Sequence, residues 1–222
     1  MYIHNPVTAV IYRFICLFLC GYGLFINALP LSPSHVLHML SYFTILTNLL
    51  CLYVYIKCIF ISSASMLSNE LAKYNNTIVF FKGLATVSAV VSCIAYHYVL
   101  RKNGLAYTIR GLMIIESNDF FVHYIVPFVT VTDWLLFQPK GLFKWKYIGI
   151  WMLFPLIYFA FAMLRYGISG NYPYYFMNIN RYGIRTFIFT IFLIALLCLI
   201  TGILLVYLDY FINKYFPVKG KK

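Results

Sequence analysis

Acidic residues are scarce in this sequence: Asp and Glu together number 5 among 222 residues, and charged residues of both signs make up only 10%. A soluble globular domain carries roughly 25% charged residues. The chain is instead 63% hydrophobic and 20% aromatic, with a mean hydropathy of +0.85. This composition excludes an ordinary soluble domain and predicts an integral membrane protein.

The sequence also lacks the patterns of nucleic-acid and zinc-binding proteins. The net charge is +12, but the basic residues stand singly between apolar runs and form no patch or arm, so we expect no nucleic-acid partner. The six cysteines include no CxxC pair, and we interpret them as small apolar packing residues. His38, His97 and His123 could in principle bind a metal, but no HxxxH or HxxE spacing supports this, so we predict neither metal nor cofactor.

Long apolar runs fill most of the chain and predict an all-α bundle of six transmembrane helices in one domain, residues 1–222. Each run has about the 20 residues that a membrane crossing needs. The helices are expected at about 7–29, 35–61, 77–100, 119–137, 147–164 and 184–211. Three connections have distinct character: 62–76 is a polar loop, 103–118 contains an apolar cluster (112–115) suited to a short interfacial helix, and 165–182 is a tyrosine-rich segment predicted to fold as a lid.

Particular residues indicate how the helices are arranged. Small residues along 77–100, Gly83 among them, predict that this helix is central, and Pro155 predicts a kink in its own helix. Arg13 lies near the start of the first helix, where its side chain is expected to snorkel to the headgroups. An orientation with both termini in the cytoplasm puts most Lys and Arg on the inner side, as the positive-inside rule favours.

Two stripes of polar residues lie inside the apolar helices. The segment 35–61 carries one at steps of three or four residues, and 119–137 carries the other. Neither stripe can face lipid, because a polar group in a bilayer needs a partner or a cavity. We therefore expect them to meet in a polar pocket in the outer half of the bilayer, where Tyr96 and His97 also arrive. The stripes are His38, Ser41, Thr44, Asn48, Cys51 and Tyr55, and Asp119, His123, Pro127, Thr130 and Asp133.

This pocket would bring together groups capable of nucleophilic catalysis. A threonine hydroxyl needs a base to take its proton, and a buried neutral His123 suits that role for Thr44. The Asn48 amide, one turn below Thr44, could donate to an oxyanion. Asp133 lies about 15 Å along the helix from His123, so it is expected to anchor a deeper network with Thr130 or Asn48. The alternatives are a threonine that only bonds to its own helix and ionisable groups that line a proton or ion pathway.

Several short motifs stand out along the chain: SYFTILTNLL at 41–50, Tyr96-His97, HYIVP at 123–127, DWLLF at 133–137, Pro139-Lys140-Gly141 and Tyr172-Pro173-Tyr174. These motifs resemble those of the androgen-induced gene family of membrane hydrolases and of the androgen-dependent TFPI-regulating protein, and they resemble the bacterial six-helix branch of that superfamily more closely. The resemblance spans nearly the whole chain. It implies hydrolysis of fatty acid esters of hydroxy fatty acids by Thr44 and His123. In the animal members the asparagine follows the threonine one residue sooner, so Thr47 is the other candidate nucleophile.

The sequence therefore predicts two alternative functions of different classes. The first is an intramembrane lipid ester hydrolase with Thr44, His123 and Asn48 as catalytic residues, in the bacterial inner membrane, with acyl esters and membrane lipids as partners. The second is a non-enzymatic carrier of lipids or small molecules. The residues expected to contact substrate are Tyr42, Thr47, Tyr96, His97, Asp133, Tyr172 and Tyr174.

Overall fold

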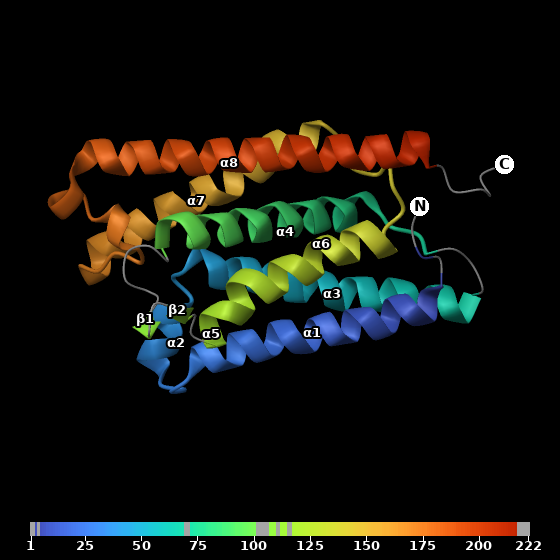
Figure 1. Ribbon diagram of the computed structural model, residues 1–222, viewed down its shortest axis with the longest axis horizontal. Helices are drawn as coiled ribbons and strands as arrows, with labels where there is room; N and C mark the ends of the chain where they lie inside the picture. The colour runs from blue at the N-terminus through green and yellow to red at the C-terminus, as the bar shows by residue number, and fades with distance from the viewer. Residues whose placement is uncertain are drawn as a thin grey trace.

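The computed structural model describes residues 3, 5–68, 72–100, 107–109, 112–114 and 117–216, which are mostly helical (Figure 1). Five helices are long and apolar enough to cross a membrane, and a sixth apolar helix, Phe121–Phe137, is shorter, which fits a multi-pass membrane protein. The five are α1 (Pro6–Ala28), α3 (Phe43–Ser68), α4 (Asn76–Ala95) with the π-helical turn η1 (Tyr96–Leu100), α7 (Lys146–Ser169) and α8 (Ile179–Tyr215). This shorter helix consists of the π-helical turn η3 (Phe121–Ile125) followed directly by α6 (Val126–Phe137).

The short elements gather at one end of the bundle. They are α2 (Pro33–Met39), the strands β1 (Tyr107–Ile109) and β2 (Leu112–Ile114), α5 (Ser117–Phe120) and the 3-10 turn η4 (Tyr175–Met177). Figure 1 shows α2, the two strands and α5 at the left, whereas α1 begins and α8 ends at the right. The chain therefore enters and leaves the bundle at the same end.

The single helix expected at 35–61 is wrong, because α2 and α3 are separate helices with a break at residues 40–42. The Ser41 backbone N–H and side chain both donate to the His38 carbonyl, which closes α2. The Tyr158 hydroxyl of α7 donates to the Ser41 carbonyl at 3.0 Å. The helix also extends beyond the expected end to Ser68, and Ser62 is buried where a polar loop was predicted.

The interfacial helix expected around 112–115 is also wrong for the residues that the structure describes. Residues 107–109 and 112–114 pair as antiparallel strands, with Tyr107 opposite Ile114 and Ile109 opposite Leu112. Aromatic and β-branched residues favour an extended backbone. The remainder of 103–118, apart from 117 and 118, lies outside the described residues.

The last two long helices extend beyond their expected ends. α7 continues to Ser169 and stops at Gly170, which has φ 69°. α8 begins at Ile179, with the Asn178 side chain accepting from the Arg181 N–H, but Gly183 (φ 79°, ψ 156°) interrupts it. A residue with a side chain rarely adopts that conformation, so glycine sets the break. Regular helix resumes at 184, where the sequence predicted the helix to begin.

α4 is the most buried of the five long helices, as its small residues predicted. A Cβ atom placed on Gly83 would lie 2.1 Å from the indole ring of Trp151 in α7, so glycine is what permits this approach. The Trp151 indole N–H donates to the Phe80 carbonyl of α4 at 3.1 Å, which fixes the ring in place.

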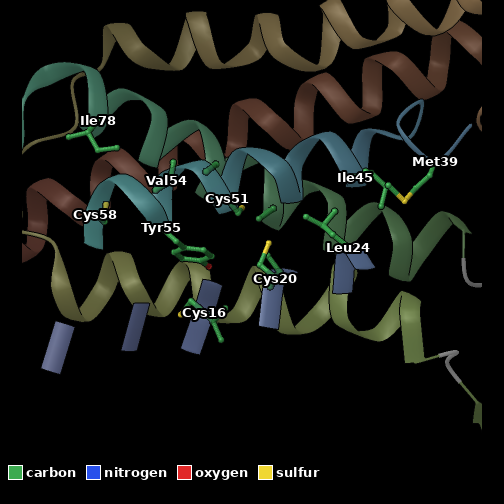
Figure 2. Close-up of a cluster of buried hydrophobic side chains, with 14 residues drawn as sticks. Cys16, Cys20, Leu24, Met39, Ile45, Cys51, Val54, Tyr55, Cys58 and Ile78 are labelled. Carbon is green, nitrogen blue, oxygen red and sulfur yellow. The ribbon is translucent and has the colours of Figure 1, made fainter. Parts of the chain in front are cut away.

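A cluster of buried apolar side chains lies between α1, α3, α4 and α6 (Figure 2). Four cysteines, Cys16 and Cys20 of α1 and Cys51 and Cys58 of α3, are fully buried in it and form no disulfide. They act as small packing residues, as predicted. Tyr55 lies in the same cluster and places its hydroxyl 2.6 Å from that of Thr130 in α6.

Arg13 does not reach the headgroups, so the prediction that it snorkels is wrong. Its Nε donates to Asp133 Oδ1 at 2.7 Å, and Lys82 pairs with the other oxygen, Oδ2. All three side chains are buried. Arg13 also donates to Ser62 and to the hydroxyl of Tyr74. Charge compensation across α1, α4 and α6 makes burial possible here, whereas an unpaired guanidinium would have to reach water.

Candidate active site

A cavity of about 790 Å³ lies among α2, the start of α3, η1, η3 and the segment 173–182. Its lining includes two of the three candidate catalytic residues, Thr44 and His123, but not Asn48. It also includes three tyrosines expected to contact substrate, Tyr42, Tyr96 and Tyr174. Segments far apart in the sequence therefore contribute to one hollow, because α3, α4 and α6 run side by side (Figure 1).

The central contact of the cavity joins Thr44 to His123. Thr44 stands in the first turn of α3 and His123 in the middle of η3, with Oγ1 and Nε2 3.1 Å apart. Both residues are buried. The other ring nitrogen, Nδ1, lies 3.0 Å from the backbone carbonyl oxygen of Asp119 and 3.8 Å from its carboxylate.

These partners determine which ring nitrogen carries the proton. A carbonyl oxygen only accepts, so His123 Nδ1 carries the hydrogen and donates to Asp119. Nε2 of the neutral ring then has a free lone pair and accepts the Thr44 hydroxyl. The arrangement is a hydroxyl, a base and a group that orients the base, which is the pattern of an activated nucleophile.

Ser92 and Tyr96 complete the surroundings of this pair. Ser92 Oγ lies 2.9 Å from Thr44 Oγ1, and because the single Thr44 hydrogen is directed to His123, Ser92 is the donor. The Tyr96 ring stacks on the His123 imidazole at 3.9 Å between centroids. Its hydroxyl donates to Asp119 Oδ2 at 3.1 Å. Tyr96 therefore holds both the ring and the residue that orients the ring.

The π-helical turn that carries His123 follows from Pro127. In an α-helix the N–H of residue 127 would donate to the His123 carbonyl, but proline has no N–H and its ring crowds that carbonyl. The preceding turn is widened, and the Val126 N–H reaches back to the Phe121 carbonyl. Such turns are rare within helices and occur often at functional sites.

Asn48 is bound in a way that the sequence did not predict. Its side-chain nitrogen donates to the Thr44 carbonyl at 2.8 Å and to the Val122 carbonyl at 3.1 Å. An amide has two hydrogens, so both are engaged. Asn48 joins α3 to η3 beside the Thr44–His123 contact, and donation to an oxyanion would require one of these bonds to break.

Tyr174, from the tyrosine-rich segment, lies over Thr44. Burial raises the pKa of Tyr174 to about 12, and the nearby side chain and backbone of Thr44 partly oppose the rise. The phenol is therefore protonated at neutral pH and able to donate. Its ring also meets the edge of Tyr42, with centroids 5.4 Å apart.

A second, smaller pocket of about 40 Å³ adjoins the cavity at Thr44. Thr44, Leu100 and Tyr174 line both spaces. The other walls of the smaller pocket are mainly apolar, with Phe43 and Phe159 among them. Thr44 thus stands between a cavity that contains histidines and an arginine and a pocket suited to hydrocarbon.

Several predicted site residues lie away from the cavity lining. Asp133 pairs with Arg13 and Lys82, not with Thr130 or Asn48, and Thr47 Oγ1 is buried with no hydrogen-bond partner among the described residues. His97 bonds to the Tyr124 hydroxyl, and Tyr172 stacks on Tyr166. Of the two candidate threonines, Thr44 is the one that contacts His123.

The sequence predicted Asp119 in a polar stripe of the pocket but indicated no chemical role for Asp119 or Ser92. Ser92 was grouped with the small packing residues of its helix, and only its burial beside Thr44 distinguishes it. Asp119 stands four residues before His123 and so shares its helix face, a spacing that could have identified it as the orienting group. Within the described ranges, no three His, Cys, Asp or Glu side chains are grouped as metal ligands would be.

Comparisons of the chain with protein-family models, with curated proteins and with solved structures found no match in any of the three. The family resemblance of the motifs stays a prediction, and the geometry of the site is what indicates a function.

Proposed function

We propose that this protein is an intramembrane lipid ester hydrolase in which Thr44 is the nucleophile and His123 is first the general base and then the general acid. The observation that carries the proposal is the hydrogen bond from the Thr44 hydroxyl to His123 Nε2, with the opposite ring nitrogen held by the Asp119 carbonyl. A buried threonine usually bonds to the carbonyl one turn before it. Thr44 is bonded to an oriented imidazole instead.

The reaction follows from these positions. Thr44 Oγ1 attacks the ester carbonyl carbon while its proton passes to His123 Nε2, and the carbonyl oxygen becomes an oxyanion. Collapse breaks the bond to the alcohol oxygen, which leaves with the proton from His123, and the acyl group remains on Thr44. Water then gives a proton to His123 and attacks the acyl carbon, which releases the acid and restores the Thr44 hydroxyl.

The neighbouring hydroxyls have separate roles in this scheme. Ser92 donates to Thr44 Oγ1 and stabilises negative charge on that oxygen when it acts as a leaving group. Tyr174 is the donor to the oxyanion, because its protonated phenol lines the cavity beside Thr44. Asn48 positions the two catalytic elements relative to each other by its two bonds.

The substrate class follows from the two spaces that meet at Thr44. The apolar pocket suits the start of an acyl chain, and the larger cavity suits the polar part of the ester. The motif resemblance favours fatty acid esters of hydroxy fatty acids. The same proposal puts the cavity in the outer half of the bilayer of a bacterial inner membrane, with both termini in the cytoplasm.

Ester hydrolysis by purified protein in detergent tests the proposal, with Thr44→Ala compared with Thr47→Ala as the matched control. Loss of the nucleophile should reduce turnover by about 10³-fold or more. Thr47→Ala, one helical turn away and outside the cavity lining, should retain turnover within about 3-fold, since it removes no group of the proposed mechanism. Equal loss in both variants would contradict the proposal, and no hydrolysis by the wild-type protein would favour the carrier function.

A further inference from the structure

A chain of three hydrogen-bonding side chains leads to the wall of the cavity beyond Thr44. Arg165 Nη2 of α7 lies 3.2 Å from His38 Nδ1, and His38 Nε2 lies 3.0 Å from the Tyr42 hydroxyl. Guanidinium only donates, so His38 Nδ1 accepts from Arg165, and Nε2 carries the hydrogen that is donated to Tyr42. Burial and the charge of Arg165, followed by His35, lower the pKa of His38, which agrees with a neutral ring.

This direction of donation leaves the Tyr42 hydroxyl hydrogen for another acceptor. The hydroxyl oxygen already accepts from His38, and both His38 and Tyr42 line the cavity. These hydrogen bonds, which begin at the charged Arg165, polarise the Tyr42 hydroxyl and leave it free to donate at the cavity wall.

Positive charge gathers around the same wall. Arg181 lines the cavity and lies over the Tyr182 ring at 5.3 Å, and in the described part of the chain no carboxylate pairs with its guanidinium. Arg165 Nη1 is buried and has no hydrogen-bond partner among the described residues. His35 also faces the cavity, but its ring nitrogen Nε2 is taken up by the Asn27 carbonyl.

Asp119 is the one acid among the described residues of the cavity lining, and its carboxylate already has partners. Its carboxylate accepts from Tyr96 and lies against His123. Among the described residues, no carboxylate pairs with Arg181 at the cavity wall or with Arg165 behind it. Arginine is the side chain best suited to bind carboxylate or phosphate oxygens.

We infer that Tyr42 and Arg181, supported by the chain from Arg165 through His38, form a binding site for an anionic head group, a carboxylate or a phosphate, on the lipid that enters the cavity. The inference rests on the proposed function, because that head group would belong to the ester substrate. It adds a specificity site: an acyl ester with a free acidic group would be held with its charge at Arg181 and its ester at Thr44, whereas a neutral ester would lack the first contact.

Binding of a fluorescent fatty acid separates this site from catalysis. The probes are cis-parinaric acid and its uncharged methyl ester, titrated into detergent-solubilised wild-type protein and variants. Arg181→Gln and Tyr42→Phe should each weaken binding of the acid by about 10-fold, as expected for loss of a hydrogen bond to a charged group, and should change binding of the methyl ester by less than about 2-fold. Competition by oleate, which has a carboxylate, and by oleoyl lysophosphatidic acid, which has a phosphate, identifies the preferred head group. The site prefers the head group of the compound that displaces the probe at the lower concentration.

Arg185→Gln is the matched control, because Arg185 stands four residues further along α8, is exposed and lies outside the cavity lining. It should bind both probes like the wild-type protein. The inference is overturned if neither Arg181→Gln nor Tyr42→Phe weakens binding of the acid, or if they weaken binding of the acid and of the methyl ester equally. It is also overturned if Arg185→Gln weakens binding as much as Arg181→Gln does. If binding selects for charge as expected but no ester is hydrolysed, the anion site stands and the proposed hydrolase function fails.

Discussion

Arg13 donates to Asp133 at 2.7 Å although 120 residues separate them in the chain. Lys82 pairs with the second carboxylate oxygen, so one buried anion is shared by two buried cations from two other helices. Removal of one partner from such a group leaves uncompensated charge in a medium that solvates it poorly. The trio therefore fixes α1, α4 and α6 relative to one another.

Asp133→Asn should destabilise the protein by about 3–5 kcal/mol, because both cations would lose their counter-charge. The thermal unfolding midpoint in detergent measures this. Lys144→Gln is the control: Lys144 is exposed, donates to the Asn76 side chain at 2.9 Å, and its loss should change stability by less than about 1 kcal/mol. An Asp133→Asn variant that melts like the wild-type protein yet loses turnover would show that the trio acts on the active site and not on the fold.

Gly83→Ala should destabilise the packing of α4 against α7, because the new Cβ would overlap the Trp151 ring. Overpacking of this kind costs about 1–3 kcal/mol. Gly149 of α7 is the matched control, since nothing lies within 4 Å of a Cβ placed there. Gly149→Ala should leave the melting temperature unchanged or raise it, and equal melting of the two variants would contradict the close contact.

The apolar runs and small residues were sufficient to predict where most helices lie and which of them is central. The break at residues 40–42 could not be predicted in the same way, because the carbonyl of Ser41 is satisfied by Tyr158, which is 117 residues away. The prediction that Arg13 snorkels was wrong for a related reason. Neighbouring residues in the sequence offer Arg13 no counter-charge, and only the fold brings Asp133 within reach.

The contact between Thr44 and His123 was predictable in outline, because two polar faces in an apolar bundle must both avoid lipid. The roles of the side chains around this contact could not be predicted. The sequence could not show that the two Asn48 hydrogens are taken by backbone carbonyls, or that Ser92 of a third helix donates to Thr44. Such roles depend on which helices are adjacent and on their relative depth.

Ester hydrolysis should fall as the pH is lowered, because protonation of His123 removes the lone pair that accepts the Thr44 proton. Burial favours the neutral ring, so activity should stay constant through neutral pH and decline only on the acidic side. A pH profile of kcat/KM measures the effect. A rate that rises on acidification would contradict the general-base role of His123.

Ser92→Ala should lower turnover by about 10-fold to 100-fold with little change in melting temperature, because it removes one donor to the reacting oxygen and leaves a small cavity. Ser88 of the same helix, also buried and one turn earlier, is the control, and Ser88→Ala should leave turnover within about 2-fold of the wild-type value. Equal rates for Ser92→Ala and the wild-type protein would exclude Ser92 from the mechanism.

The most direct test of the central claim is the site of covalent modification by a fluorophosphonate, located by mass spectrometry of the labelled protein. The account predicts an adduct on Thr44, absent in Thr44→Ala, strongly reduced in His123→Ala and unchanged in Thr47→Ala. An adduct on another residue, or labelling of Thr44 that does not depend on His123, would contradict it.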